Sequence, residues 1–435
     1  MHMLPRPSQD PILTGDRPAG EVAEELWQRL QAEPWPLPLE ALPPGTALVG
    51  GAVRDGLLGR LEPQPDLDLV VAGDAIALTR QLARNHGGTC VVLDAAHGIA
   101  RLVMGGWTID LARRDGDSLE ADLGRRDYTV NAIALPLKGN GQAPRALVDP
   151  TGGLTHLGRR ELVAVSEANL LADPLRLLRG IRLACSLDFA LEPTSRGWIE
   201  RHGGLLSQVA GERVLAELEK LATAPNGEQG LGQALACGLL QGWGADASAG
   251  SLLAGLHRDR AQQRGLDAAE TAWALPLARL SALLPAQALA GLRSSRRLQQ
   301  RCRALRHWQG QLAQVGGWGA LGEVSSLALH RELEADLPAL LLLTPEPHLP
   351  LLARWRNPND PQLHPRPPPD GRSHQQHLAI PAGPDLGRLL DHLTLERAFG
   401  RLPGDGEPDA AALALDAAER WWRQKGGGEP GGRRD

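Results

Sequence analysis

A glycine turn followed by a strand with two aspartates is the feature that most constrains how this 435-residue chain can fold. In LVGGAVRDGLLG, an apolar strand runs into Gly50 and Gly51 and then into a helix, so backbone N–H groups can approach a phosphate closely. Arg54 lies one turn into that helix, where its fork of donors can reach a phosphate. The pattern is neither GxGxxG nor GxxxxGKS/T, so it predicts neither a dinucleotide fold nor a P-loop. A plain strand-to-helix turn is the alternative interpretation.

Two aspartates separated by one residue follow in DLDLVV. On a strand, Asp66 and Asp68 point to the same face, which brings their carboxylates close together. Mg²⁺ is bound in this way, by a few carboxylates plus substrate phosphates, and two such ions can clamp the attacking and leaving oxygens of a phosphoryl transfer. A bare DxD is more often an exposed polar strand face, but the glycine turn upstream favours a metal site.

Composition and charge indicate an ordinary globular protein. Hydrophobic residues make up 42% and charged residues 22%, and the net charge of -5 with a pI near 6.2 means that any nucleic acid must bind through local basic patches. The four cysteines are far apart and form no metal-ligand spacing. Neither a signal-peptide core nor an apolar run of membrane-spanning length is present, so we expect a cytoplasmic protein with no membrane partner.

The pattern of apolar residues changes along the chain. Residues 1–20 are predicted to be disordered, and 21–33 helical. From 45 to 137 the sequence alternates between strands, at TALVGG, DLDLVVAG, TCVVLD and WTIDLARR, and helices, at AVRDGLLG and AIALTRQLARNHG. From about residue 160 the periodicity is helical. This order predicts an α+β protein.

Five short segments in order carry a family resemblance. LVGGAVRDGLLG, DLDLVV, RRDYTVNAIAL, DPTGGL and DPLRLLRGIR, between about residues 47 and 190, resemble the class II tRNA nucleotidyltransferase and bacterial poly(A) polymerase family. A weaker likeness in GERVLAELEKL extends to about residue 222. The resemblance implies template-independent addition of nucleotides from CTP, and also ATP, to the 3′ end of tRNA, with Mg²⁺ as the cofactor.

The resemblance also implies a domain order, an N-terminal nucleotidyltransferase palm followed by an all-α neck, body and tail. The expected parts are an N-terminal extension and helix (1–44), the palm or head (45–158), a neck that recognises the base (159–225), an RNA-binding body (226–356), a Pro-rich linker (357–383), a helical tail (384–424) and a flexible C-terminus (425–435).

Roles in the head follow from the same resemblance. The triphosphate contacts are Gly50, Gly51 and Arg54, and the Mg²⁺ ligands are Asp66 and Asp68. Asp110, in WTIDLARR, lies where some polymerases of this superfamily carry a third catalytic carboxylate, with a polar strand edge as the alternative.

The RRDYTVNA segment is implied to contact the sugar and phosphates of the nucleotide. Arg126 matches a nucleotide contact, and Asp127 and Asn131 are candidates to bind the ribose hydroxyls, because a carboxylate accepts and an amide both donates and accepts. Outside this context, Arg125 and Arg126 would be interpreted as a solvated surface pair.

The LADPLRLLRGIR segment is implied to choose the base. If it is helical, a step of three residues turns about 300°, so Asp173, Arg176 and Arg179 share a broad face. Arg182 would then point nearly opposite Asp173, toward phosphate or an adjoining domain. An ion pair of Asp173 with Arg176 at the helix start is the structural alternative.

The chemistry of base selection can be argued from these side chains. Aspartate only accepts hydrogen bonds and arginine only donates them. Cytosine and adenine offer an amino donor beside a ring-nitrogen acceptor, whereas uracil and guanine present the reverse. The pair Asp173 and Arg176 would therefore accept C and A and reject U and G, because each mispaired buried polar group costs about 1–3 kcal/mol.

Three departures from the family pattern leave the product open. Ala172 stands where Glu precedes the aspartate, and His156 stands where Asp is usual. Only Gly116 and Asp117 remain between IDLARRD and SLEADLGRRD, where relatives carry a longer loop tied to the switch from C to A addition. A CC-adding enzyme, which would need a separate A-adding partner enzyme, is therefore a serious alternative. Poly(A) polymerase and an inactive tRNA-binding relative are further alternatives.

A run of arginines is the candidate RNA-binding surface. RSSRRLQQRCRALR, residues 293–306, holds six arginines and no acid. On a continuous helix Arg293, Arg297 and Arg301 would share a face, with Arg296 beside them. Such a patch could bind the phosphates of tRNA, and a solubilising surface helix is an equally weighted alternative.

Overall fold

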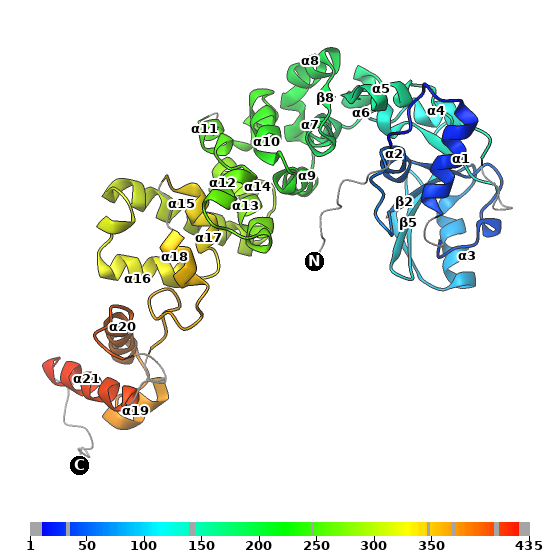
Figure 1. The fold of residues 1–435 in the computed structure, drawn as a ribbon. Coiled ribbons are helices and arrows are strands. Elements are labelled where there is room, and N and C mark those ends of the chain that lie inside the picture. Colours follow the sequence, from blue (N-terminus) through cyan, green and yellow to red (C-terminus); the bar gives the residue numbers. More distant parts are fainter. Residues whose placement is uncertain are drawn as a thin grey trace. The chain divides into compact units, whose positions relative to one another are not determined.

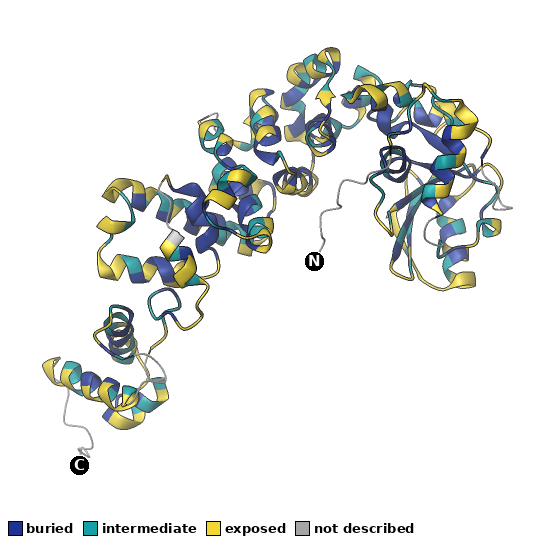
Figure 2. Cartoon of the chain, viewed as in Figure 1, coloured by how far each residue is buried: buried dark blue, intermediate teal, exposed yellow. Residues whose placement is uncertain are grey.

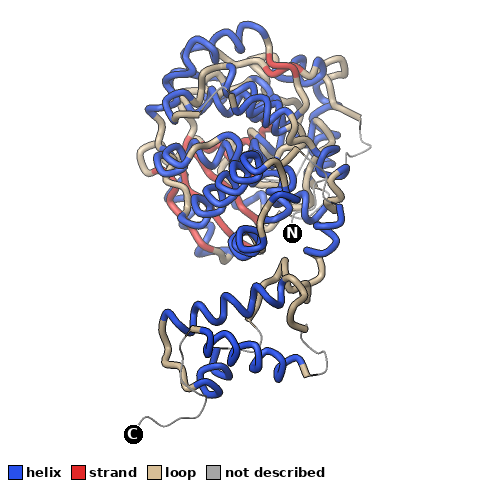
Figure 3. The backbone as a smooth tube through the Cα atoms, turned by 90° about the vertical axis from the view of Figure 1, so that its left-hand side faces the viewer, coloured by secondary structure: helices blue, strands red, loops and turns tan. Residues whose placement is uncertain are grey.

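The computed structural model describes residues 11–31, 35–138, 144–245, 248–345, 349–367, 371–403 and 409–425 (Figure 1). The chain divides into two compact units, Met1–Glu217 with Ala236–Gly242, and Leu218–Leu235 with Trp243–Asp435. Within the described residues the strands belong to the first unit, and the second is built from helices and loops (Figure 3). The predicted α+β class, with an N-terminal mixed sheet and a helical remainder, is confirmed.

The first unit is built around a six-stranded sheet in the order β3-β4-β5-β2-β1-β6. β2 and β5 run parallel, and the other neighbouring strands are antiparallel. The strands are β1 (Ala47–Val49), β2 (Leu67–Val71), β3 (Thr89–Asp94), β4 (Ile99–Met104), β5 (Trp107–Arg113) and β6 (Ala134–Pro136). The parallel pair at the centre brings residues of β2 and β5 that are far apart in the sequence side by side.

The two faces of the sheet are covered differently. Helix α3 (Ala75–His86), whose N-terminus is capped by the Asp74 carboxylate, packs against β3, β4 and β5. On the other face, Leu123 of α4 (Leu119–Leu123) joins a buried cluster with Val49, Val70 and Ala134. Asp68 pairs with Val49 in the ladder, so Asp68 lies on this second face.

The rest of the first unit is helical apart from a short two-stranded sheet. Its further elements are α1 (Ala19–Leu30), α2 (Gly51–Leu57), α5 (Gly153–Arg159), β7 (Glu161–Leu162), α6 (Glu167–Ala172), α7 (Leu175–Leu187), β8 (Ala190–Leu191), α8 (Pro193–His202) and the first half of α9 (Gly211–Thr223), whose residues from Leu218 on belong to the second unit. Helix α7 is amphipathic and buries Leu177, Ile181 and Ala184. Its polar face is therefore left for the arginines that the sequence singles out.

The second unit consists of helices α10 to α21. Their bounds are α10 (Gly227–Ala236), α11 (Ala249–Ala254), α12 (Arg258–Gln263), α13 (Ala268–Leu283), α14 (Ala286–Gly291), α15 (Arg296–Val315), α16 (Glu323–Glu332), α17 (Leu337–Leu343), α18 (Leu349–Trp355), α19 (Gly371–Leu378), α20 (Pro384–Ala398) and α21 (Ala410–Gln424). All seven residues of α17 are buried, and α17 packs against α13 and α15 (Figure 2). No helix in the described part of the chain is both long and apolar enough to span a membrane.

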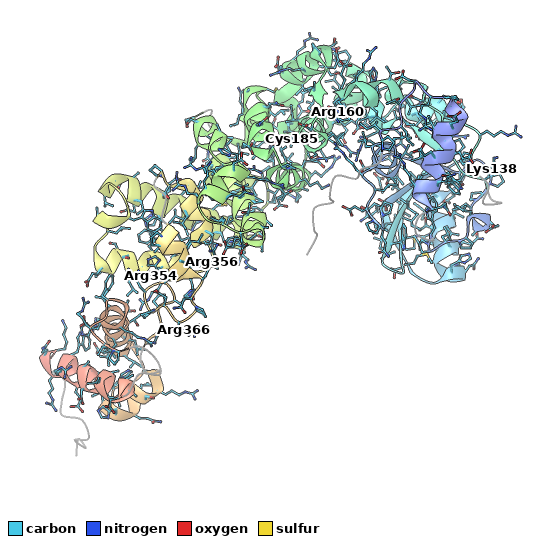
Figure 4. All side chains as sticks on the ribbon, viewed as in Figure 1. Lys138, Arg160, Cys185, Arg354, Arg356 and Arg366 are labelled. Carbon is cyan, nitrogen blue, oxygen red and sulfur yellow. The ribbon has the colours of Figure 1, made fainter. Side chains whose placement is uncertain are left out.

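A buried arginine ties several segments of the second unit together. Arg279 of α13 is 1% exposed and pairs with the buried Glu228 carboxylate of α10. It also donates to the carbonyls of Ala222, Ala224 and Leu256, at 2.7, 2.9 and 2.9 Å. Nearer the surface, Arg354 of α18 and Arg356 just after it (Figure 4) pair with Asp360 and Glu270.

Several segments differ from the sequence-based expectations, among them the short strands β6, β7 and β8, which were not predicted. Strand β4 was not predicted; its Arg101 lies on the face opposite the buried Ala100 and Leu102 and has its partner, Asp110, on another strand. The predicted linker 357–383 contains helix α19, which buries His374 and Leu378. Of the segment predicted to be disordered, residues 1–10 lie outside the described residues, whereas Leu13 is buried and α1 already begins at Ala19.

Candidate active site

The glycine turn lies directly against one of the two predicted metal-binding carboxylates. Gly50, the residue before α2, has φ 73° and is buried. A Cβ atom at Gly50 would lie 2.8 Å from Oδ2 of Asp68, closer than real Cβ contacts allow. Both the backbone angle and the close approach therefore require glycine at this position.

The three predicted carboxylates lie near one another. Asp68 of β2 is the ladder partner of Asp110 of β5, and Asp66 is the residue before β2 begins. Asp66 is exposed and Asp68 is half-buried. Burial, together with the neighbouring charges of Asp110 and Asp66, raises the pKa of Asp68, although Arg126 and Arg179 oppose the shift. Repulsion between these carboxylates is the condition that a bound divalent cation would relieve.

Asp110 has a partner that the sequence did not indicate. Arg101 of β4 donates from Nε and Nη2 to the two oxygens of Asp110, at 2.7 and 2.8 Å. The two residues are ladder partners in adjacent antiparallel strands. Asp110 therefore lies beside Asp66 and Asp68, and Arg101 compensates its charge. This pairing could not be predicted from the sequence, because it depends on the register between β4 and β5.

Arg54 is connected to the segment that follows the sheet. Its Nε and Nη2 donate to the two oxygens of Asp55, each at 2.8 Å, and its Nη1 donates to Oδ1 of Asn131 at 2.7 Å. The amide of Asn131 donates in turn to Oδ1 of Asp127 at 3.2 Å. Two residues predicted from separate segments, Arg54 and Asn131, thus form one network.

Asp127 is buried and its carboxylate is already engaged. Its Oδ2 pairs with Nε of Arg179 at 2.7 Å, and its Oδ1 accepts the backbone N–H of Tyr128. Burial alone would raise its pKa, but Arg179 and the two hydrogen bonds from Tyr128 and Asn131 outweigh burial and lower the pKa. A ribose hydroxyl would have to enter this network, so the ribose contact of Asp127 and Asn131 stays a prediction.

Arg126 combines a partner with an unsatisfied donor. Its Nη2 donates to the Asp122 carboxylate of α4 at 3.1 Å. Its Nε is buried and has no hydrogen-bond partner among the described residues. A buried donor without a partner is costly. The Nε–H of Arg126 is therefore available to donate to a further ligand, such as a phosphate or sugar oxygen.

The base-reading residues do not all lie on one helix. Asp173 comes before α7 with φ -141°, so the helical spacing predicted for it is wrong. Pro174 separates Asp173 from the helix and prevents a continuous turn. The carboxylate of Asp173 pairs with Arg213 of α9 at 2.8 Å and not with Arg176, so the alternative of an Asp173–Arg176 pair at the helix start is not found in this structure.

Arg182 has an internal partner within the first unit. It pairs with the buried Glu217 of α9, and burial lowers its pKa. The sequence placed Arg182 toward phosphate or an adjoining domain, whereas the structure gives it a carboxylate. Neither Arg213 nor Glu217 was found from the sequence, although both lie in the segment GERVLAELEKL that extends the family likeness.

The predicted arginine patch is only partly helical. Helix α15 begins at Arg296, while Arg293 has φ 53°, so the predicted face of Arg293, Arg297 and Arg301 does not exist. Arg301 pairs with the Asp336 carboxylate and lies over the ring of Trp273. Arg296, Arg297 and Arg303 are exposed on α15, and no ion pair involves them in the described part of the chain.

A mixed sheet with a glycine turn against the Asp68 carboxylate is the arrangement expected of a nucleotidyltransferase, the enzyme class to which this protein belongs. Residues 46–116 match the family model of the poly A polymerase head domain, and 188–243 match that of the probable RNA and SrmB-binding site of polymerase A. A CC-adding tRNA nucleotidyltransferase of Synechocystis sp. is 34% identical over 406 residues, which cover 87% of this chain and 96% of that protein. The chain belongs to the tRNA nucleotidyltransferase family.

Two further similarities support the family and the fold. An A-adding tRNA nucleotidyltransferase of Deinococcus radiodurans is 42% identical over 208 residues, 47% of this chain and 46% of that protein. The Bacillus stearothermophilus CCA-adding enzyme in complex with CTP has a similar structure, with a TM-score of 0.66 at 23% identity over 94% of this chain and 100% of that chain. The structural likeness thus covers nearly the whole of both chains.

Proposed function

We propose that this protein adds nucleotides from CTP, and also from ATP, to the 3′ end of tRNA without a template. The observation that carries the proposal is the contact of the Gly50 turn with Asp68, beside Asp66 and Asp110. This geometry can place a nucleotide triphosphate on a backbone turn next to carboxylates that bind Mg²⁺. The relative from Synechocystis, similar over nearly its full length, supports tRNA as the RNA substrate.

Asp66 and Asp68 would hold Mg²⁺, which when bound lowers the pKa of the attacking hydroxyl and stabilises the leaving pyrophosphate. The pKa of Asp68 is raised first by burial and then by the neighbouring Asp110 and Asp66 carboxylates, and a bound cation would offset the repulsion among these charges. Among the described residues no group of three or more His, Cys, Asp and Glu side chains is arranged to hold a metal. The oxygens of the nucleotide phosphates would therefore complete the ligand set.

The protein's side chains and backbone bind and orient the nucleotide for the transfer. The RNA 3′-hydroxyl attacks the α-phosphate in line, and the bond to pyrophosphate breaks. Arg54 and the backbone at Gly50 and Gly51 orient the triphosphate, and Arg126 supplies its unsatisfied Nε to the nucleotide. Asp173 and Arg176 select the base by accepting from its amino group and donating to its ring nitrogen.

A product that ends at CC is the second candidate, and the loop after β5 favours it. Asp115 pairs with Arg125, and the Asp115 N–H donates to the Asp122 carboxylate at 2.9 Å. Arg114 donates to the carbonyl of Asp117 at 3.1 Å, so these contacts close the connection to α4 tightly. Because this connection is short and held by an ion pair and hydrogen bonds, few residues in it could rearrange for A addition.

Incorporation assays on defined ends test both candidates. Transcripts of tRNA ending at the discriminator base, after C and after CC would each be given labelled CTP or ATP. We expect two C additions, and the CC candidate further requires that ATP is not used on the CC transcript. Completion to CCA would overturn the CC candidate alone.

The rival functions give different results in the same assay. Repeated A addition to unrelated RNA would indicate a poly(A) polymerase. No incorporation by Mg²⁺-loaded wild-type protein, with Asp66→Ala and Asp68→Ala indistinguishable from it, would leave only an inactive tRNA-binding relative.

A further inference from the structure

One guanidinium nitrogen of Arg176 is fixed by two backbone carbonyls. Nη1 of Arg176 donates to the carbonyl of Arg125 at 2.9 Å and to the carbonyl of Asn169 at 3.0 Å. An arginine has five N–H donors, of which Nη1 supplies two. The Nε and Nη2 donors of Arg176 remain for a nucleobase, along one edge of the guanidinium plane.

The carbonyls on either side of the Arg125 carbonyl are held by the side chain of Asn169. The Asn169 Nδ2 group donates to the carbonyls of Gly124 and Arg126, at 2.8 and 2.7 Å. These two carbonyls flank that of Arg125, so the amide of Asn169 sets the course of the chain from Gly124 to Arg126. Asn169 therefore acts on Arg176 twice, through its own carbonyl and through that of Arg125.

We propose that Asn169 is a positioning residue for base selection, which aims the free edge of Arg176 at the base through the Gly124–Arg126 backbone. This inference rests on the proposed function. Asn169 lies in the first turn of α6, where its own N–H is already occupied by the Ser166 cap at 3.1 Å. The cap of α6 is therefore supplied by Ser166. The side-chain amide of Asn169 instead donates to the carbonyls of Gly124 and Arg126, on either side of Arg125.

The chemistry predicts a loss of discrimination and not of turnover. Without the two amide donors, the Arg125 carbonyl can move, and the Arg176 guanidinium can rotate to donate to a carbonyl of uracil. The carboxylates around Asp68 are untouched by the change. The variant should therefore keep its maximal rate with CTP while binding CTP more weakly and accepting UTP more readily.

Asn169→Asp tests the inference, because it preserves shape while it replaces both donors by an acceptor. Steady-state addition of C and of U to a tRNA transcript would be compared with the wild type. We expect KM for CTP to rise about tenfold and kcat with CTP to change less than about threefold. The preference for CTP over UTP should fall about tenfold or more, because one misplaced polar contact is worth about that factor.

Two controls separate positioning from folding. Ser166→Ala removes the cap of α6 and should lower the melting temperature while base preference stays at the wild-type value. In an Arg176→Ala background, Asn169→Asp should cause no further loss of preference, because the group that it positions is gone. Unchanged preference in Asn169→Asp, or an additive loss in the double variant, would overturn the inference. Absence of any C addition by the wild type would instead overturn the proposed function.

Discussion

The predicted active-site residues are joined by contacts that couple helix α2, the segment between α4 and β6, and helix α7. Arg179 pairs with Asp127, Asp127 accepts from Asn131, and Asn131 accepts from Arg54. Networks of buried polar side chains of this kind define geometry more than they add stability. Single substitutions at these positions should therefore change the rate of nucleotide addition and the stability of the fold to different extents.

Gly50→Ala should reduce the rate of nucleotide addition strongly. The new Cβ would lie 2.8 Å from Oδ2 of Asp68 on a backbone with φ 73°, so the carboxylate or the turn must move. A displacement of about 1 Å in such a site costs roughly 100-fold in rate. Gly73→Ala, with open space around its Cβ position and an ordinary φ, is the matched control and should be active at the wild-type rate in the same incorporation assay.

Asp127→Asn should destabilise the protein in a pH-dependent way. The folded-state pKa of Asp127 is lowered, so its charged form contributes stability above the ordinary carboxyl pKa of 3.8, and this contribution is lost as the pH falls through the lowered value. We expect the variant to be less stable by about 1–3 kcal/mol at neutral pH. Urea unfolding at pH 7 and at acid pH measures this, and a difference that grows toward acid pH would contradict the assignment.

At the scale of elements, much of the head followed from the sequence. The glycine turn, the strand with two aspartates and helix α3 each carry a local signal, namely apolar alternation, a cap and a terminal glycine. Arg101, Arg213 and Glu217 could not be predicted, because their roles depend on strand register or on helix packing between distant segments. Asp173 was misplaced because Pro174 interrupts a pattern that is helical on both sides.

Helix α15 makes a testable distinction among its arginines. Arg296 and Arg303 are seven residues apart, about two turns, and so share an exposed face, whereas Arg301 is committed to Asp336. The double variant Arg296→Ala, Arg303→Ala should bind tRNA more weakly, with a salt dependence reduced by about two phosphate contacts, and should melt like the wild type. Arg301→Ala should instead lower the melting temperature. If the double variant and the wild type bind tRNA with equal affinity, this face of α15 does not bind tRNA and serves only as a solubilising surface.

On the scale of the whole molecule, the second unit depends on a polar centre within its apolar core. Arg279 joins the chain near residue 222, helix α10 and the segment before α12. Arg279→Leu would leave Glu228 buried without its partner and three carbonyls without a donor. We expect a loss of about 3–5 kcal/mol in the free energy of unfolding, measured by urea with tryptophan fluorescence. The double variant Arg279→Leu, Glu228→Leu should recover part of this loss, since no unpaired charge remains.

The sequence holds a single tyrosine, and it is placed where it can report on the reaction. Tyr128 is fully buried, and its hydroxyl donates to the Arg176 carbonyl at 2.9 Å. Burial and then the charge of Asp127 raise its pKa, so the phenol stays protonated at any pH suited to assays. Protein grown with 3-fluorotyrosine would give one ¹⁹F resonance, with no assignment needed. That resonance would follow the first turn of α7 as CTP, UTP or tRNA is added, without a dye or an engineered cysteine.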